Sequence, residues 1–103
     1  MVLVKSVIPI IDGWLFVTFD NDEQKIVDIK PHMNGILEKL KNPEFFKQVF
    51  VDPELETVSW PGELDFDPDN LYKQGIDIIN IINIIKGSAG KIIYDQNDSR
   101  AKA

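Results

Sequence analysis

Residues 12–29 read DGWLFVTFDNDEQKIVDI, and this stretch decides which class of fold the chain is expected to adopt. It opens on Asp12-Gly13, a dipeptide that favours the tight turn of a β-hairpin. Residues 14–19 follow as a strand with two apolar faces, so this strand is expected to be central or covered on both sides. A polar turn leads to a returning strand at 24–29, and a β-branched run at 2–11 precedes the hairpin turn. The pattern predicts an antiparallel meander of three strands.

The spacing of apolar residues changes after Pro31. Over residues 36–40 they recur at helical intervals, which predicts a short helix. Asn42-Pro43 ends it, because a proline disfavours helical geometry in the residue before it, and the same proline can open a further helical turn. Segments 49–51 and 57–60 are rich in strand-forming residues, so we expect a hairpin there.

The last third of the chain is predicted to be mainly helical. Asp67-Pro68 is typical of a helix start, with Asp as N-cap and Pro at the first helical position. Residues 76–86 hold seven isoleucines among regularly spaced polar residues, which favours a second helix with a broad apolar face. The segment 87–90, Gly-Ser-Ala-Gly, is expected to end this helix, and 91–94 to add a terminal strand. From residue 95 onward we expect fraying.

These segments together predict an α+β fold, a small antiparallel sheet packed with short helices in the order β-β-β-α-β-β-α. The chain has 103 residues, the size of one ordinary domain, and its 44% hydrophobic and 27% charged residues are typical of a globular protein. We expect a single domain over residues 1–94 and a frayed C-terminal tail over 95–103.

Charge points to the class of partner. The net charge is −6, and residues 52–69 hold seven acids with no lysine or arginine. A chain this acidic repels phosphates, so direct nucleic-acid binding is not expected. The acidic segment favours a basic protein as partner, although a merely solvated acidic loop explains the same pattern.

The sequence also indicates a cellular location. It contains no cysteine, which excludes disulfides and thiolate metal sites and agrees with a reducing compartment. The first residues lack the basic lead and the small-residue cleavage site of an export signal. The most apolar stretch, 76–85, is half as long as the roughly 20 residues that a membrane span needs. We expect a cytoplasmic protein without contact with the membrane.

Residues with catalytic or metal-binding chemistry are sparse. His32 is the only histidine, and no orienting partner stands beside it in the sequence. Asp65-x-Asp67-x-Asp69 resembles the start of a calcium loop, but Asn70 stands where such a loop needs glycine and Ile76 where it needs glutamate. We expect no catalytic residue, no metal and no cofactor, and therefore no enzyme.

The densest local signal is the corner at residues 60–68, WPGELDFDP. In a structural interpretation, Trp60 ends a strand and packs in the core, Pro61-Gly62 turns the chain, and the next helix begins. In a functional interpretation, the corner displays Trp60, Glu63 and Asp65 to a partner. The structural interpretation is favoured, and the functional one stays open.

At these residues the chain resembles the bacterial family known as domain of unknown function 2442. The features that carry the resemblance are Asp28 with Pro31, Leu40 before Asn42-Pro43-Glu44-Phe45-Phe46, Val51-Asp52, Val58-Ser59-Trp60-Pro61, and Asp65-Phe66-Asp67-Pro68 with Leu71-Tyr72. The family more often has Asn-Gly after Trp-Pro, whereas this chain has Gly62-Glu63, which also serves a tight turn. The resemblance implies a small protein without established enzymatic activity, encoded next to another short protein, as the antitoxin of a toxin–antitoxin pair.

The leading hypothesis is thus an antitoxin that neutralises a small basic protein encoded nearby. Two alternatives stay open: a small-molecule-binding domain with Trp14, Phe16 and Phe19 lining a pocket, and a metal site on the carboxylates of 65–69.

A homodimer is also expected, because the predicted helix 76–86 carries more apolar surface than one small sheet covers. The residues expected at that contact are Ile78, Ile79, Ile82 and Ile85.

Overall fold

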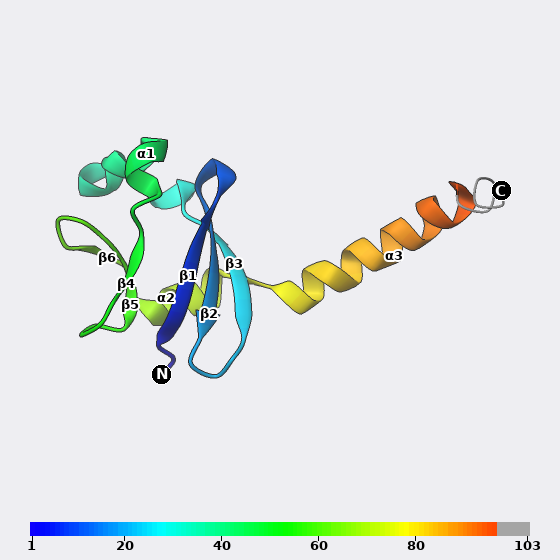
Figure 1. Cartoon of the computed structure of the whole chain (residues 1–103), viewed down its shortest axis with the longest axis horizontal. Coiled ribbons are helices and arrows are strands. Elements are labelled where there is room, and N and C mark those ends of the chain that lie inside the picture. The colour runs from blue at the N-terminus through cyan, green and yellow to red at the C-terminus, as the bar shows by residue number, and fades with distance from the viewer. Residues whose placement is uncertain (97–103) are drawn as a thin grey trace.

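Two antiparallel sheets and several short helices build the packed part of the molecule, and one long helix extends from it (Figure 1). The structure is a computed structural model that describes residues 1–96, with side-chain detail as far as residue 87. Its strands are β1 Val4–Ile10, β2 Trp14–Phe19, β3 Gln24–Asp28, β4 Phe50–Asp52, β5 Thr57–Trp60, β6 Leu64–Asp65 and β7 Ile76–Asp77. Its α-helices are α1 Pro43–Phe46, α2 Pro68–Gln74 and α3 Ile78–Gln96, and its 3-10 helices are η1 Ile11–Gly13, η2 Lys30–His32 and η3 Gly35–Lys41. The predicted α+β class is confirmed.

The predicted meander forms the larger sheet, with strand order β1-β2-β3-β7 and all neighbours antiparallel. The first turn holds Asp12 at φ 66° and Gly13 at φ 80°, the left-handed conformation that Asp-Gly supplies at low cost. The two-residue strand β7 joins at the far edge. Residues 76–77 were predicted as the start of the helix 76–86, which is wrong for these two residues, because a strand this short shows no periodicity in the sequence.

Strand β2 is central, as expected, but its two faces differ in burial. Leu15, Val17 and Phe19 are fully buried on the inner face, whereas Trp14 and Phe16 on the outer face are half-buried. The inner face is covered by α2, where the Tyr72 ring meets the ring of Phe19 edge-on at 5.1 Å. Among the described residues, no helix or strand covers the outer face.

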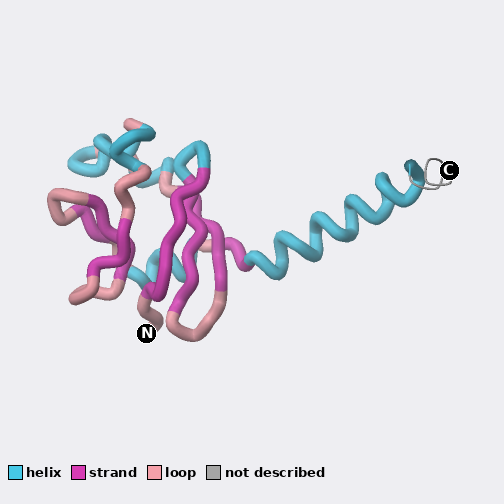
Figure 2. The backbone as a smooth tube through the Cα atoms, viewed as in Figure 1, coloured by secondary structure: helices cyan, strands magenta, loops and turns pink. Residues whose placement is uncertain are grey.

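The second sheet contains the predicted hairpin of β4 and β5, with the short strand β6 as an additional member in the order β4-β5-β6. All four residues of β5 are buried. The backbone N–H of Val4 donates to the carbonyl of Glu56 over 2.9 Å and thereby joins the two sheets. Figure 2 shows the two sheets side by side, with the short helices of residues 30–46 at their upper end and α2 behind the strands.

The predicted helix starts are confirmed. The Asn42 side chain accepts a hydrogen bond from the backbone N–H of Glu44 at the start of α1, over 2.9 Å. The Asp67 side chain likewise accepts from the backbone N–H of Asp69 at the start of α2, over 3.0 Å. Such caps satisfy backbone donors that have no partner inside the helix. The helix expected over 36–40 is present as the 3-10 helix η3.

The predicted end of the last helix is wrong. Helix α3 continues through 87–90, and residues 91–94, predicted as a strand, are part of the same helix. A glycine inside a helix costs only about 1 kcal/mol relative to alanine, and Gly87 does not adopt the left-handed conformation that would end the helix. Of the predicted frayed tail, Asp95 and Gln96 belong to α3, and residues 97–103 lie outside the described residues.

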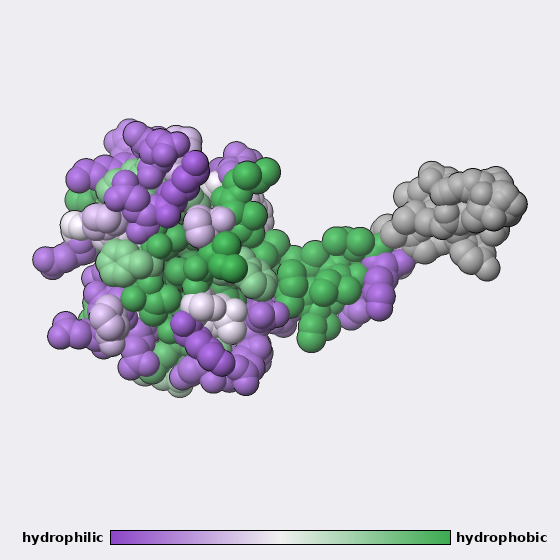
Figure 3. All heavy atoms as spheres, in the orientation of Figure 1, coloured by the Kyte–Doolittle hydropathy of each residue, from purple (hydrophilic) through white to green (hydrophobic). Residues whose placement is uncertain are grey.

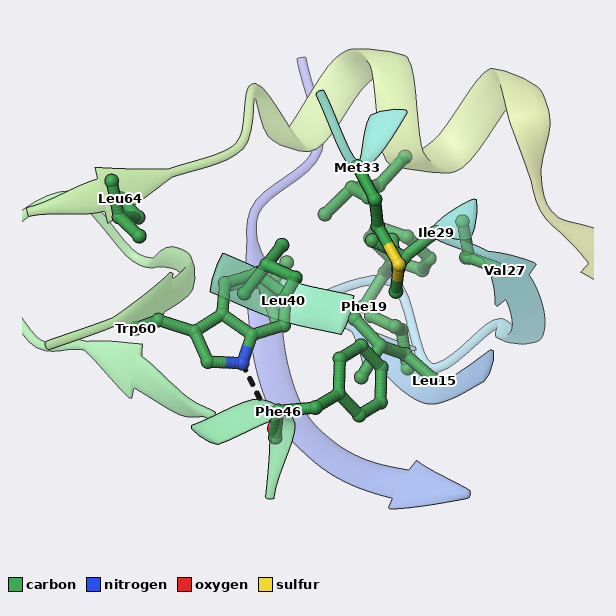
Figure 4. Close-up of a cluster of buried hydrophobic side chains, with 13 residues drawn as sticks. Leu15, Phe19, Val27, Ile29, Met33, Leu40, Phe46, Trp60 and Leu64 are labelled. Carbon is green, nitrogen blue, oxygen red and sulfur yellow. Dashed lines mark hydrogen bonds between the residues drawn. The ribbon is translucent and has the colours of Figure 1, made fainter. Parts of the chain in front are cut away.

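The core lies between the inner face of the larger sheet, the smaller sheet and the short helices (Figure 4). Its largest fully buried side chains include Trp60, Phe19, Leu15, Ile29, Leu40 and Leu71. None of the described side chains of helix α3 belongs to this core. The radius of gyration of 17.2 Å exceeds the roughly 13 Å of a compact domain of about 100 residues, because α3 extends away from the packed part (Figure 1).

Candidate interaction surface

The outer face of the larger sheet carries an apolar row across all four strands. Strand register places Ile8 opposite Phe16, Phe16 opposite Ile26, and Ile26 opposite Ile76. Strands lie about 4.8 Å apart, so this row spans roughly 14 Å. Ile8 is 56% exposed and Ile76 45% exposed, and the two side chains between them are half-buried. A second row, Ile10 and Trp14, lies beside it.

The apolar surface continues from this row on to α3, which begins two residues after Ile76. The four isoleucines Ile79, Ile82, Ile84 and Ile85 are exposed by 45–67%. In Figure 3 an apolar, green band crosses the middle of the packed part and continues on to the first turns of the helix, with polar side chains above and below it. We call the outer-face rows and residues 78–85 together the apolar surface. Exposed apolar patches of more than a few hundred Å² mark interaction sites in soluble proteins.

The residues predicted at a dimer contact lie on this helix. Ile78, Ile82 and Ile85 share one side, because they follow each other at intervals of four and three residues. Ile81, which the prediction omitted, belongs to the same side. Ile79 points about 60–160° away from these four residues, at 100° per residue. Ile78 and Ile81 are half-buried, whereas Ile82 and Ile85 are open.

The seven acids of 52–69 split into two groups with different roles. Four of the seven carboxylates accept hydrogen bonds within the fold: Asp52 from Glu54 and Leu55, Asp65 from Ser59, Asp67 from Asp69, and Asp69 from Val2. The three glutamates, Glu54, Glu56 and Glu63, are exposed. Among the described residues no lysine or arginine forms an ion pair with any of the seven.

These glutamates sit at two ends of the smaller sheet. Glu54 and Glu56 lie in the turn before β5, and Glu63 lies in the turn after it (Figure 1). Four strand residues separate the two turns by about 13 Å. The acidic segment is therefore two acidic loops rather than one patch.

Of the predicted contact residues at the corner, Trp60 is fully buried. Its indole N–H donates to the backbone carbonyl of Phe46 over 2.9 Å (Figure 4). The centroid of its ring lies 5.6 Å from the ring centroids of both Phe46 and Phe66. The functional interpretation of Trp60 as a displayed side chain does not agree with this burial, and the structural interpretation does. Glu63 and Asp65 are exposed.

The aromatic pocket considered from the sequence does not form. Phe19 lies on the inner face of β2 and is fully buried, whereas Trp14 and Phe16 lie on the outer face. Alternation along a strand puts these residues on opposite faces of the sheet. The three side chains therefore cannot line one pocket.

The polar side chains considered for chemistry have structural partners. His32 Nε2 lies 2.7 Å from Gln74 Oε1, which accepts a hydrogen bond from the imidazole N–H, and the imidazole meets the ring of Phe66 edge-on. In the described part of the chain no three His, Cys, Asp or Glu side chains come together as a metal site. No helix within residues 1–96 is long and apolar enough to cross a membrane.

One carboxyl group has a perturbed pKa. Burial raises the pKa of Asp28, but the hydrogen bonds and the charge of Lys30 outweigh this effect and leave the pKa below its ordinary value. Lys30 Nζ lies 2.9 Å from Asp28 Oδ1, and the Lys30 backbone N–H donates to the same oxygen over 3.0 Å. This pair closes the turn after β3.

Sequence reasoning missed the apolar row on the outer face. The signal was present, since Ile8, Phe16, Ile26 and Ile76 alternate with inward residues in their strands, but register is needed to place them side by side.

The comparisons with known proteins agree with this fold. The family model "Protein of unknown function (DUF2442)" matches residues 4–77. Among solved structures, the chain is similar to "Putative DNA Binding Protein NE0471 from Nitrosomonas europaea ATCC 19718", with a TM-score of 0.64 and 22% sequence identity. The match covers 72% of this chain and 48% of that chain, so this chain matches about half of the longer protein. None of the curated proteins matches the chain.

Proposed function

Since the chain belongs to the DUF2442 family of proteins of unknown function, we propose that it is a non-enzymatic protein-binding module, the antitoxin of a bacterial toxin–antitoxin pair. Its partner is a small basic protein encoded nearby. The observation that carries the proposal is the apolar surface, which no described element covers. An exposed apolar surface of this kind usually marks the place where another protein binds and shields it from water.

The charge of the partner follows from the acidic loops. Glu54, Glu56 and Glu63 are exposed and have no basic partner among the described residues. Such charges at the edge of an interface raise the association rate with an oppositely charged protein, while buried apolar anchors provide most of the affinity. The loops therefore support a basic partner, and the apolar surface supports tight binding.

Helix α3 supports a homodimer as the working form. Its side with Ile78, Ile81, Ile82 and Ile85 meets the same side of a second copy around a two-fold axis, the commonest symmetry of soluble oligomers. The outer face of the sheet then stays accessible for the basic protein. The net charge of −6 argues against direct binding of DNA by this chain.

Co-expression with the product of the neighbouring gene tests the function. We expect the two proteins to purify together, because their complex dissociates slowly enough to survive the purification. Glu54→Gln/Glu56→Gln/Glu63→Gln should lower the association rate and its salt dependence. The matched control, Asp12→Asn/Glu38→Gln/Glu44→Gln, removes three acids elsewhere and should change the rate much less.

Two results would count against the proposal. If the neighbouring basic protein does not bind at micromolar concentration, this chain is not its antitoxin. If a DNA fragment from its own promoter binds instead, with the steep salt dependence of phosphate contacts, the chain is a nucleic-acid-binding protein.

A further inference from the structure

A cavity of about 510 Å³ lies between the tip of the β1–β2 hairpin and the helical segment 30–47. Pockets that hold small organic ligands range from about 300 to 1,000 Å³. Ile10 and Ile11 line it from the hairpin tip, and Met33, Leu40 and Phe46 line it from the helical segment. The last three are core residues and almost fully buried, so packing fixes the floor of the cavity.

The wall of the cavity is tied in place by Lys30. Its Nζ donates to the carbonyl oxygen of Asp12 over 2.8 Å and pairs with Asp28 Oδ1 over 2.9 Å. The stem of this lysine also passes so close to Gly13 that a Cβ there would lie 2.8 Å from Lys30 Cγ. The hairpin tip is thereby held against η2, and the cavity exists before any ligand enters.

The charge of the lining is opposite to that of the chain. Three lysines, Lys30, Lys41 and Lys47, line the cavity against the single acid Asp12, in a protein of net charge −6. Lys41 and Lys47 are exposed and pair only with the acids three residues before them, at 3.8 and 3.4 Å. Exposed pairs of this kind contribute little to stability, so both ammonium groups are free to turn to a ligand.

We propose that this cavity binds a small amphipathic carboxylate, an organic acid with an apolar body and one negative charge. The apolar body rests on Ile11, Met33 and Leu40, and the carboxylate lies between the ammonium groups of Lys41 and Lys47. The positive charge of Lys30 is already neutralised by Asp28, and the carboxylate of Asp12 would repel a second negative charge on the ligand. The lining therefore favours a single charge on the ligand over a multiply charged phosphate. Of the residues that form the apolar surface, only Ile10 also lines the cavity, so the ligand site and the proposed partner surface meet at this one residue.

Titration of the full chain with octanoate tests the proposal. We expect saturable one-to-one binding by calorimetry, with amide shifts confined to residues 9–13, 30–33 and 40–47. Each buried methylene strengthens binding about fourfold, so octanoate should bind about 15-fold tighter than hexanoate. Octanol should bind more weakly, and octylammonium weakest of all. Equal affinity for octanoate and octylammonium would overturn the proposal, as would the absence of saturation at millimolar octanoate.

A matched pair of variants tests the role of the lysines. Lys41→Gln/Lys47→Gln should lower octanoate affinity about tenfold, because the variant loses two solvent-exposed ion pairs with the carboxylate. Lys39→Gln/Lys73→Gln removes the same charge from exposed positions outside the lining and should stay within twofold of the parent. Equal losses in both variants would show that net charge, not this cavity, governs binding, and would refute the site. Unchanged circular dichroism confirms that both variants are folded.

Discussion

Replacement of Trp60 separates its structural role from any role at the surface. The indole is fully buried, packs against two phenylalanine rings at 5.6 Å, and donates to the Phe46 carbonyl over 2.9 Å. Trp60→Ala leaves a cavity of most of an indole, which costs about 3–5 kcal/mol. A domain of this size has a free energy of unfolding of about 5–10 kcal/mol. The variant should therefore lose about half of its free energy of unfolding at 25 °C.

Trp60→Phe isolates the hydrogen bond. The Phe46 carbonyl also accepts from the Val49 backbone N–H over 3.3 Å, so it is not left entirely without a donor. The loss of this hydrogen bond and the smaller size of the phenylalanine ring should together lower the free energy of unfolding by about 1–2 kcal/mol, near the low end for a buried unsatisfied group.

Urea unfolding followed by far-ultraviolet circular dichroism measures both variants. With a slope of about 1 kcal/mol per molar urea, Trp60→Phe should move the midpoint down by about 1–2 M. Trp14→Phe is the control, since Trp14 is half-buried on the outer face and should shift the midpoint less. A Trp60→Ala protein with near-parental stability and lost partner binding would refute the assignment of Trp60 to the core.

Four further outcomes follow from single groups. Asp67→Ala should cost about 1 kcal/mol by loss of the α2 cap, and Asp67→Asn, which keeps a capping oxygen, much less, as measured by thermal melting. Glu63 sits at φ 61°, so Glu63→Gly should raise the free energy of unfolding by about 0.5–1 kcal/mol in the same assay. The pKa of Asp28 is lower in the folded protein than the ordinary carboxyl pKa of 3.8, so its pairing with Lys30 stabilises the fold at any pH above 3.8. This stabilisation is lost as the pH falls through the lower pKa of the folded state, and acid unfolding of Asp28→Asn should lack that loss. Millimolar calcium should leave the melting temperature unchanged relative to sodium of equal ionic strength, because Asp67 and Asp69 are already used within the fold; a rise of several degrees would reveal a metal site.

Local chemistry in the sequence was enough to predict much of the fold. The Asp12-Gly13 turn, the alternation of Leu15 and Val17 with outer residues, and the Asp67-Pro68 helix start are each decided by neighbours within a few residues. The strands of the meander and the later hairpin follow from the same signals.

Features that depend on tertiary contacts escaped prediction. Strands β6 and β7 have two residues each and exist because Ser59 and Lys25 offer them an edge to pair with. The end of α3 was placed too early because glycines at 87 and 90 were given more weight than their cost of about 1 kcal/mol each justifies. The two alternatives for Trp60 could be weighed from the sequence, but only packing against Phe46 and Phe66 decides between them.

The candidate site divides in the same way. The isoleucines of α3 and the acids of 52–69 were visible in the sequence, because composition alone marks them. The row from Ile8 to Ile76 and the cavity beside Lys30 bring together residues that lie far apart in the chain. Only strand register and the packing of the hairpin tip bring them together.

The mass of the intact chain in solution tests most directly whether the apolar surface of α3 is covered by protein. Light scattering at high micromolar concentration should give twice the chain mass of 11.8 kDa. Ile82→Asn/Ile85→Asn, which changes two exposed residues on the contact side of α3, should give the mass of one chain with an unchanged circular dichroism spectrum. A mass of 11.8 kDa for the intact chain throughout this concentration range would contradict the dimer and with it the assignment of α3 as an interface between copies.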